Sequence, residues 1–568
     1  MRSPAFIVTP YEARRLPGLV LFLVVALYVL AGLWGRDPWG RADAEGFGVA
    51  LTMARGGLTD WLAPNVFGLP ITEEGPLPGW LGAAAILLLG SVLGEPNAAR
   101  LASGLVTAAG LLAIWLATGR LATRPEIQPT DPFEVSASAR DIGRAVADAA
   151  LLVCVATCGL IARVHESSAI AFQFAWLAAF AWGAALAIER PVGGGLIAGF
   201  AIAASALTRG LPVAVALMAV IILLPWVSQR YRLVGGAMLT ATAAALAVLT
   251  LPWPMALLTQ HPEGAEWLRA WLGWNAAEVG SGSLRSLVFL ARNLPWYLWP
   301  AWPLALWAIW QWRKQWRSPS LALPLLMALA ALALMLITPS PTESMMLPTV
   351  VPFAILTALA LPVVKRGLVS LLDWIAVATF SLIGVVIWAY WIALLTGFPP
   401  RMADSAARLA PGFVSDTLLL QAGAGLIASL AWLALVGWRT ARRPRAIWRP
   451  MALSSGGLLL AWVLLIALWL PAYDARVSYR GVAREIARAL GSHDGCIRGE
   501  PLDAGQRASL AYFGNLRFNQ PGERCDWLLM RDDARAPIAL PSKQWRQVWQ
   551  GRRPFDNTER FVLYRREP

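Results

Sequence analysis

The sequence predicts an all-α, multi-pass membrane protein with a small α/β domain at its C-terminal end. Of its 568 residues, 57% are hydrophobic and only 14% are charged, and the mean hydropathy is +0.55. A soluble domain carries roughly 25% charged residues. The apolar residues form runs of about 18–25, the helix length that crosses a bilayer core. Because these runs lack the two-residue alternation of barrel strands, the membrane part is predicted to be helical.

The positions of the basic residues predict how the chain is oriented in the membrane. Basic clusters at 230–232, 313–317, 365–366 and 439–445 alternate with loops that lack them. Positive residues favour cytoplasmic loops, so residues 257–284, 339–344 and 397–415 are predicted to lie outside. Arg14 and Arg15 precede the first apolar run, which is read as an uncleaved anchor that starts in the cytoplasm. This topology, rather than nucleic-acid binding, explains the net charge of +14.

The runs indicate about 13 transmembrane helices in a membrane domain of residues 1–471. This count includes a span at 77–94 and one broken crossing at 193–227. If 193–227 were two crossings there would be fourteen, and one end of the chain would change sides, so the local topology of 94–227 is left open. Residues 36–76 form a first periplasmic loop, in which Gly46–Arg55 is amphipathic and suited to the membrane surface.

Residues 472–568 are polar and of mixed charge, and they predict a small periplasmic α/β domain. A helix is expected at Tyr479–Leu490, followed by short strands at 525–530 and 560–564. Cys496 and Cys525 lie in this domain. In an oxidising periplasm they are predicted to form a disulfide that closes a loop of about 28 residues and stabilises by roughly 3 kcal/mol. The alternative is a pair of free buried thiols.

The acidic residues of the first loop are the most informative candidates for chemistry. Asp43 and Glu45 follow the first apolar run, and Glu73 and Glu74 immediately precede the second. Carboxylates held at a membrane surface can take a proton from an acceptor, or bind a divalent cation that offsets a lipid phosphate. The alternative is that they are ordinary solvated residues of an external loop.

Four further polar residues are candidates for substrate binding. Arg209 interrupts an apolar run, where a charge costs about 2.5–3.5 kcal/mol at mid-membrane, although it could instead extend to the interface. His261 and Asn275 lie among tryptophans and acids that suit a sugar, or form a plain interfacial aromatic belt. Glu343 lies in a turn-rich loop and either contacts substrate or serves the turn alone.

Several phrases of the sequence occur together in one family of membrane enzymes. They are DAEGFG from Asp43, FGLPITEEGPLPGWL from Phe67, ARLASGL from Ala99, TRGLPVAVAL from Thr208, AEWLRAWLGWN from Ala265 and LPTVVPFAIL from Leu347. In this order they resemble phrases of the bacterial aminoarabinose transferase and protein O-mannosyltransferase group, the glycosyltransferases of families 39 and 83. These are multi-span enzymes of the GT-C class. The resemblance covers most of residues 17–365.

The resemblance implies transfer of a sugar from a polyprenyl-phosphate donor, on the periplasmic side of the bacterial inner membrane. The acceptor would be lipid A, another glycan or a protein. Asp43 would be the catalytic carboxylate, acting as base or as orienting group, with Glu73 as its supporting acid. His165 and Glu166 fall where the group has a polar residue near the reaction centre; otherwise they would cap or pair helices. No cofactor is implied with certainty, and a divalent metal ion is left open.

Three departures from the group's pattern keep other functions under consideration. Ala44 breaks the usual adjacent acid pair, Glu74 replaces a lysine suited to a lipid phosphate, and Met345 replaces a frequent tyrosine. If phosphate is still bound, the candidate cations are Arg100, Arg163 and Arg209, with Arg209 preferred. The alternative functions are a transporter or flippase of lipid-linked sugars, and a member of the group that has lost catalysis.

Overall fold

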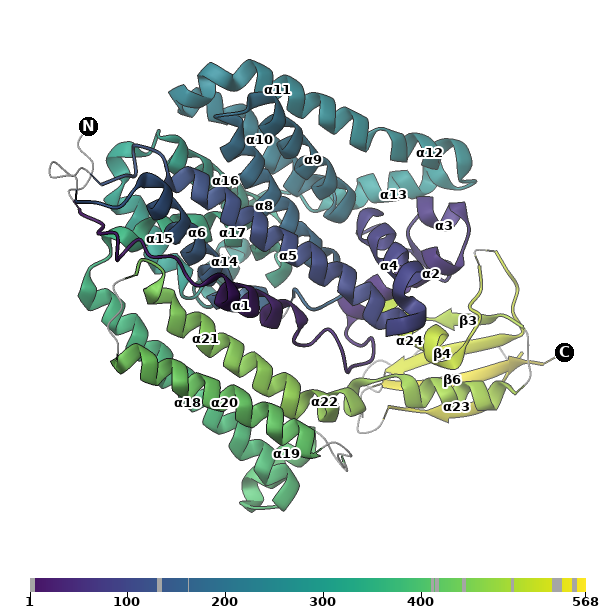
Figure 1. Cartoon of the computed structure of the whole chain (residues 1–568). Helices are drawn as coiled ribbons and strands as arrows, with labels where there is room; N and C mark the ends of the chain where they lie inside the picture. The colour runs from purple at the N-terminus through teal and green to yellow at the C-terminus, as the bar shows by residue number, and fades with distance from the viewer. Residues whose placement is uncertain are drawn as a thin grey trace.

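The computed structural model contains a bundle of long helices with a small domain at one end (Figure 1). It describes residues 6–129, 135–161, 163–409, 413, 418–441, 446–491, 495–520, 522–533, 544–553 and 559–567. The basic residues at 442–445 lie outside these ranges. We call the end of the bundle next to the C-terminal domain the domain end. The opposite end, which holds the ion pairs of Arg120 and Arg124 with Glu189, is the basic end.

Most of the long helices of the membrane domain coincide with predicted apolar runs. They are α1 (Gly18–Leu30), α2 (Arg41–Arg55), α3 (Leu58–Leu62), α4 (Leu77–Leu93), α5 (Glu95–Ala122), α6 (Ala139–Ala156), α7 (Cys158–Ile161), α8 (Ala169–Ala187), α9 (Pro191–Arg209), α10 (Leu211–Val227), α11 (Gln229–Thr250), α12 (Pro252–Gln260), α13 (Gly264–Ala277), α14 (Leu284–Tyr297), α15 (Ala301–Gln311), α16 (Pro319–Ile337), α17 (Val350–Ala360), α18 (Arg366–Thr396), α19 (Pro400–Leu409), α20 (Leu418–Ala441), α21 (Arg449–Leu464) and α22 (Leu470–Val477). Short 3-10 turns occupy Arg313–Gln315 (η1), Glu343–Thr349 (η2) and Leu361–Val363 (η3), a π-helical turn occupies Leu465–Trp469 (η4), and β1 (Asn65–Val66) pairs with β2 (Leu69–Pro70).

The predicted span at 77–94 is wrong, because α4 begins and ends at the domain end. Its start follows Gly75, whose N–H donates to the Thr208 carbonyl at 2.9 Å. Just beyond its end, Glu95 forms an ion pair of 2.8 Å with Arg55 at the end of α2. Helix α4 is therefore a juxtamembrane helix that packs on α2, and α5 begins at the domain end.

The predicted broken crossing at 193–227 is also wrong, because α9 and α10 are two separate crossings. A Cβ added at Gly195 would lie 2.4 Å from the Met238 carbonyl oxygen, and one at Gly199 would lie 2.5 Å from that of Thr242. The contacts advance together along α9 and α11, so these two helices are parallel and α10 between them runs back. Gly210, with φ +92°, makes the reversal in one residue. The prediction counted α4 as a crossing and counted α9 and α10 together as one. Because these two errors offset each other, the expected total of thirteen crossings does not change.

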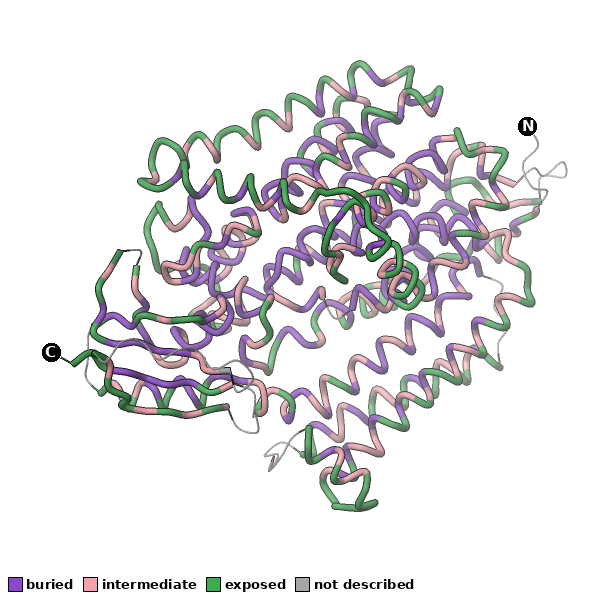
Figure 2. The backbone as a smooth tube through the Cα atoms, turned by 180° about the vertical axis from the view of Figure 1, so that it is seen from behind, coloured by how far each residue is buried: buried purple, intermediate pink, exposed green. Residues whose placement is uncertain are grey.

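The bundle has an inner layer and an outer layer of helices. Among the described residues, nine helices are long and apolar enough to cross a membrane. In the most apolar stretch of α8, 83% of residues are buried, and in Glu343–Val363 89% are. In α20 only 17% are buried, and Figure 2 shows exposed residues along such peripheral helices. Because the exposed side chains there are leucine, isoleucine and valine, this layer suits contact with lipid.

The C-terminal domain is a four-stranded mixed sheet with two helices. Its elements are α23 (Arg480–Leu490), β3 (Ile497–Glu500), α24 (Ala504–Gly514), β4 (Trp527–Asp533), β5 (Trp545–Gly551) and β6 (Glu559–Arg566). The strand order is β3-β4-β6-β5, with β3 and β4 parallel and the other pairs antiparallel. Cys496 and Cys525 form a disulfide beside β3 and β4.

The C-terminal domain is seated on the first loop of the membrane domain. Helix α24 packs against α2 so closely that a Cβ added at Gly48 would lie 2.5 Å from the Ala508 Cβ. The Arg507 guanidinium donates to the Phe67 carbonyl at 2.6 Å, and the Ser509 hydroxyl donates to the Pro38 carbonyl at 3.0 Å. These contacts hold α2, and the acidic residues that it carries, between the bundle and the domain.

Candidate active site

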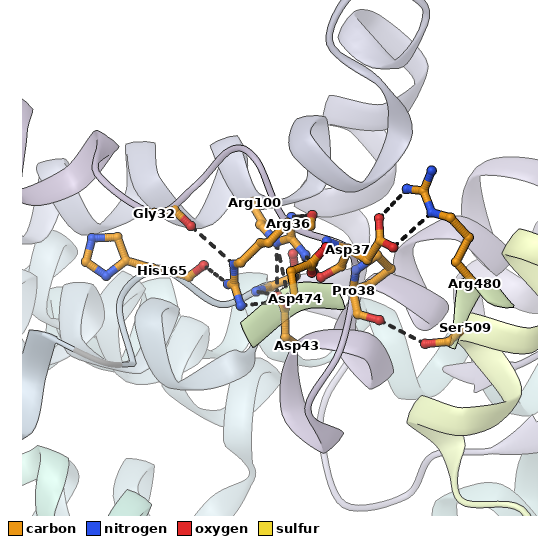
Figure 3. A network of polar contacts seen from close by, with 11 residues as sticks. Gly32, Arg36, Asp37, Pro38, Asp43, Arg100, His165, Asp474, Arg480 and Ser509 are labelled. Carbon is orange, nitrogen blue, oxygen red and sulfur yellow. Dashed lines mark hydrogen bonds and ion pairs between the residues drawn. The ribbon is translucent and has the colours of Figure 1, made fainter. Parts of the chain in front are cut away.

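Asp43 lies in the first turn of α2, at the centre of a buried polar network (Figure 3). Its side chain is 1% exposed. The Arg100 guanidinium donates to it at 2.8 Å, the Arg36 guanidinium lies 3.4 Å away, and the Ser167 N–H donates to it at 2.8 Å. Helix α2 comes close enough for this because Gly46 has no side chain: a Cβ there would lie 1.6 Å from the Ser167 carbonyl oxygen.

The network makes Asp43 a fixed anion rather than a proton acceptor. Burial alone would raise the pKa of its carboxyl, but the charges of Arg100 and Arg36 and the hydrogen bonds hold that pKa below its usual value. A base for transfer near neutral pH needs a pKa closer to that pH. Of the two roles predicted for Asp43, base and orienting group, the geometry therefore favours the orienting group.

Arg100 does not fit the predicted role of phosphate ligand. It is 1% exposed, and besides Asp43 it donates to the Arg36 carbonyl and the Asp37 carbonyl, each at 2.9 Å. Its donors are used within the protein, and no face of the guanidinium is left for a ligand. His165 does not fit its predicted role in substrate binding either. It is 2% exposed and stacks on Trp462, and both of its ring nitrogens lie within 2.7 Å of carbonyl oxygens.

A second polar group lies beside this network, around Arg163. Glu166 lies 3.6 Å and Glu343 lies 3.8 Å from the Arg163 guanidinium. Burial and the nearby charge of Asp43 raise the pKa of Glu166 to about 7. The buried hydroxyl of Tyr297 faces Arg163 and has no hydrogen-bond partner among the described residues. The structure thus brings Glu166 and Glu343 together, as two of the predicted substrate-binding residues.

A third group brings together Glu45, Glu73 and Glu74 of the first loop, and Glu74 lies beside Arg209. The loop after β2 rests on the end of α9, where Gly75 must lack a side chain because its Cβ would lie 2.2 Å from the Leu207 carbonyl oxygen. Burial and Glu73 raise the pKa of Glu74 to about 7 against the opposing effect of Arg209. Burial and the charges of Glu74 and Glu73 raise the pKa of Glu45 to about 8. Glu73 itself is exposed.

Arg209 lines a small apolar cleft, of about 40 Å³, between α8, α9, α10, α13, α16 and η2. The cleft is lined by Gln173, Arg209, Pro212, Val213, Trp274, Glu278, Leu334, Thr338, Ser344, Met345, Leu347 and Pro348. Arg209 is half-buried, and within the described part of the chain it forms no ion pair and no side-chain hydrogen bond. A half-buried guanidinium without a partner is suited to an anion.

Asn275 and the buried tryptophans near it mainly support the fold, and His261 lies apart from the site. The Asn275 side chain accepts from the Leu211 N–H at 2.6 Å and donates to the Trp271 carbonyl at 2.8 Å, which fixes the turn next to Arg209. Trp253, Trp267 and Trp271 are buried, so they present no sugar-stacking face. His261 lies at the tip of the α12–α13 hairpin and accepts from the Glu263 N–H, apart from the Arg209 group.

The sequence analysis did not single out Arg36, Glu278 or Tyr297, although all three belong to this region. Arg36 directly follows the first span, a position that could have drawn attention to it. Tyr297 and Glu278 gave no signal, because a tyrosine near a tryptophan run and an acid in a loop between helices are common. Within the described residues, Glu45, Glu73 and Glu74 do not bring their carboxylate oxygens together into one cluster of possible metal ligands.

Comparison with known proteins connects this architecture to a known class. No protein-family model matches the sequence, and no curated protein matches it. Two solved structures of ArnT from Cupriavidus metallidurans, in the apo state and bound to undecaprenyl phosphate, match it with a TM-score of 0.67. The identities are 15% and 14%, and each match covers 96% of this chain and 97% of the other.

This is the GT-C fold. The likeness extends over the membrane domain and the C-terminal domain together, since nearly the whole of both chains is aligned. A weaker match, with a TM-score of 0.45 and 11% identity, is to the archaeal oligosaccharyltransferase AglB from Archaeoglobus fulgidus. At these identities the GT-C likeness describes the fold, and the chemistry has to be argued from the residues of this chain.

Proposed function

We propose that this GT-C protein transfers a sugar from a polyprenyl-phosphate donor to an acceptor on the periplasmic side of the bacterial inner membrane. The observation that carries the proposal is Arg209, a cation that lines an apolar cleft and forms no ion pair with any described residue. A polyprenyl phosphate has the matching chemistry, an anionic head on an apolar tail. One ArnT structure of the same fold is described as bound to undecaprenyl phosphate, which supports this donor class.

In the proposed complex, the isoprenoid tail lies along the apolar wall formed by Val213, Leu334 and Leu347, and the phosphate meets Arg209. This position also faces Glu74, which carries a raised pKa and is therefore partly neutral near pH 7. A neutral Glu74 repels the phosphate less than an ionised one, which offsets the replacement of the lysine found in related enzymes.

The reaction would displace the lipid phosphate from the anomeric carbon. An acceptor oxygen forms the new bond, the carbon–oxygen bond to the phosphate breaks, and the phosphate leaves on the lipid with the electron pair. Glu166 is the best-placed proton acceptor, because its raised pKa suits neutral pH and it lies between Arg163 and Asp43. Asp43 orients Arg36, and positioning and charge supply most of the rate.

Replacing Arg209 tests the proposal. In proteoliposomes that contain a polyprenyl-phosphate sugar, Arg209→Gln should lower transfer at least 100-fold, about 2.7 kcal/mol of transition-state stabilisation. It should also weaken the binding of undecaprenyl phosphate at least tenfold. Arg269→Gln, on the exposed face of α13, is the matched control and should change neither.

The same assay separates the alternative functions. Full transfer by Arg209→Gln would contradict the assignment of the phosphate site. If the parent protein binds the lipid but transfers no sugar, it is a member of the group that has lost catalysis. If it moves the lipid-linked sugar across the bilayer without transfer, it is a flippase.

A further inference from the structure

A second cleft, of about 670 Å³, opens between the membrane domain and the C-terminal domain. From the membrane domain it is lined by Gly35, Arg36, Asp37, Gly94, Pro96 and Asn97, and from the other side by Asp474, Ala475, Ser478, Arg480, Gly481, Tyr512 and Phe513. The lining thus comes from the segment after α1, the α4–α5 junction, α22, α23 and α24. Its size is within the range of small-molecule sites in proteins, roughly 300–1,000 Å³.

Both arginines of this cleft already have carboxylate partners. Arg36 lies 3.4 Å from Asp43, and Arg480 forms an ion pair with Asp37 (Figure 3). Asp37 also accepts a hydrogen bond of 2.6 Å from the Ser478 hydroxyl. Asp43 is shared between Arg36 and Arg100, and Asp474 lies close enough to interact with both arginines. Among the described residues, three carboxylates (Asp37, Asp43 and Asp474) therefore balance three arginines (Arg36, Arg100 and Arg480), and the cleft carries no excess positive charge. An anion such as a phosphate has little reason to bind here, in contrast to the site at Arg209.

The cleft instead presents the groups that recognise uncharged, hydroxyl-rich molecules. The Tyr512 ring lies 5.0 Å from the Phe513 ring, and no described residue hydrogen-bonds its hydroxyl. Arg480 stacks at 4.8 Å on Phe513 and keeps about half of its side chain exposed. Aromatic rings beside carboxylate, guanidinium and amide groups provide apolar contact together with hydrogen bonds in several directions, as saccharides require.

The wall of this cleft is continuous with the buried network at Asp43. Arg36 lines the cleft, and its buried guanidinium holds Asp43. Asp37 binds Arg480 through its carboxylate, while its own carbonyl accepts from Arg100 at 2.9 Å. Glu166, the proposed proton acceptor, faces Arg36 and Asp43 from the other side. The cleft is therefore bordered by two residues, Arg36 and Asp37, that also belong to the buried network at Asp43.

We infer that this interdomain cleft binds the saccharide part of the acceptor, which is neutral and rich in hydroxyl groups. The inference rests on the proposed function, because only a transferase needs an acceptor beside its donor. It narrows the acceptor from lipid, glycan or protein to a molecule that carries a sugar at this position. The anionic donor then binds in the cleft at Arg209, and the neutral acceptor binds in the interdomain cleft, beside Arg36 and Arg480.

Filling the cleft without disturbing its ion pairs tests this inference. Gly481 is exposed on α23, and a Cβ added there would meet nothing within 4 Å, so Gly481→Trp places a large ring in the cleft. Arg484→Trp, on the same helix and outside the cleft, is the control. Ala475→Trp fills the cleft from α22 and replaces the first variant if that one does not fold.

The readout is saturation-transfer NMR on the full chain in detergent, with maltose, lactose, chitobiose and maltotriose as probes and glucose 1-phosphate as the anionic comparison. At least one neutral saccharide should show transfer that is lost in Gly481→Trp and kept in Arg484→Trp. The inference is overturned if no neutral saccharide binds, if glucose 1-phosphate alone binds, or if Gly481→Trp leaves the signal intact. Saccharide binding without sugar transfer by the parent protein would contradict the proposed function and not this site.

Discussion

Arg100 on α5 and Arg209 at the end of α9 lie at the same end of the bundle but in different surroundings. Arg100 is 1% exposed and directs its donors to Asp43 and to the carbonyls of residues 36 and 37. Arg209 is half-buried at an apolar cleft, and none of the described residues pairs with it. A buried, saturated cation holds a fold together, whereas a half-buried, unpaired one is free to meet a ligand.

The acids around the two arginines differ in the same way. Asp43 has a lowered pKa because the charges of Arg100 and Arg36 outweigh its burial. Glu74 and Glu45 have raised pKa values, about 7 and about 8, because they are buried beside other carboxylates. Around Arg100 the charges are therefore permanent, and around Arg209 they change near neutral pH.

The largest expected effect is on stability, at the saturated arginine. Arg100→Met leaves the buried Asp43 carboxylate without its main partner, and we expect it to lower the free energy of unfolding by about 3–5 kcal/mol. Arg209→Met should change it by less than about 1 kcal/mol. Denaturant titration followed by tryptophan fluorescence compares the two. Equal losses in both variants would remove the distinction between them.

The next effect is on lipid binding, at the unpaired arginine. Glu74→Lys turns a partly ionised acid beside Arg209 into a cation, and it should tighten the binding of undecaprenyl phosphate about tenfold, or 1.4 kcal/mol. Glu266→Lys makes the same change at an exposed position of α13 and should have little effect. Weaker binding by Glu74→Lys would show that the phosphate does not approach this loop.

A smaller effect is expected from pH alone. As the pH falls from about 8.5 to 7, Glu45 and then Glu74 take up protons, so negative charge near Arg209 declines and undecaprenyl phosphate should bind several-fold more tightly. Asp43 stays ionised throughout, because its pKa is lowered. The pH dependence should flatten in the Glu45→Gln, Glu74→Gln double variant, and an unchanged profile there would assign it to other groups.

The smallest effect is expected at an exposed arginine. Arg55 pairs with Glu95 at 2.8 Å, but the two side chains are 46% and 27% exposed. Solvent screens such a pair, so Arg55→Gln should lower the free energy of unfolding by less than about 0.5 kcal/mol. The same denaturant titration measures it. A loss comparable to that of Arg100→Met would mean that burial does not separate these two ion pairs.

The sequence predicted the helical membrane domain, the C-terminal domain and the GT-C resemblance, because hydropathy and short phrases depend on neighbouring residues. It misplaced α4 and joined α9 to α10, since apolar composition does not distinguish a crossing from a juxtamembrane helix. Two local signals pointed to the correct answer. Helix α4 has only 17 residues, and Glu95 rather than a basic cluster follows it.

The candidate site was harder to predict because its contacts join distant parts of the chain. Asp43 and Arg100 are 57 residues apart, and Arg163 and Glu343 are 180 residues apart. The sequence identified Arg209 through the cost of a charge in an apolar run, which is a local argument. It could not show that Arg100 is saturated, or that Asn275, Trp267 and Trp271 serve the fold.

The seating of α24 on α2 has a consequence for how this protein can be divided. Helix α2 is covered on one side by the bundle and on the other by Ala508 and its neighbours. A truncated chain that ends at residue 471 would expose the apolar side of α2 to water and release Asp37 from Arg480. The C-terminal domain is thus not a detachable accessory, and the membrane domain expressed alone should be an unreliable substitute for the intact protein.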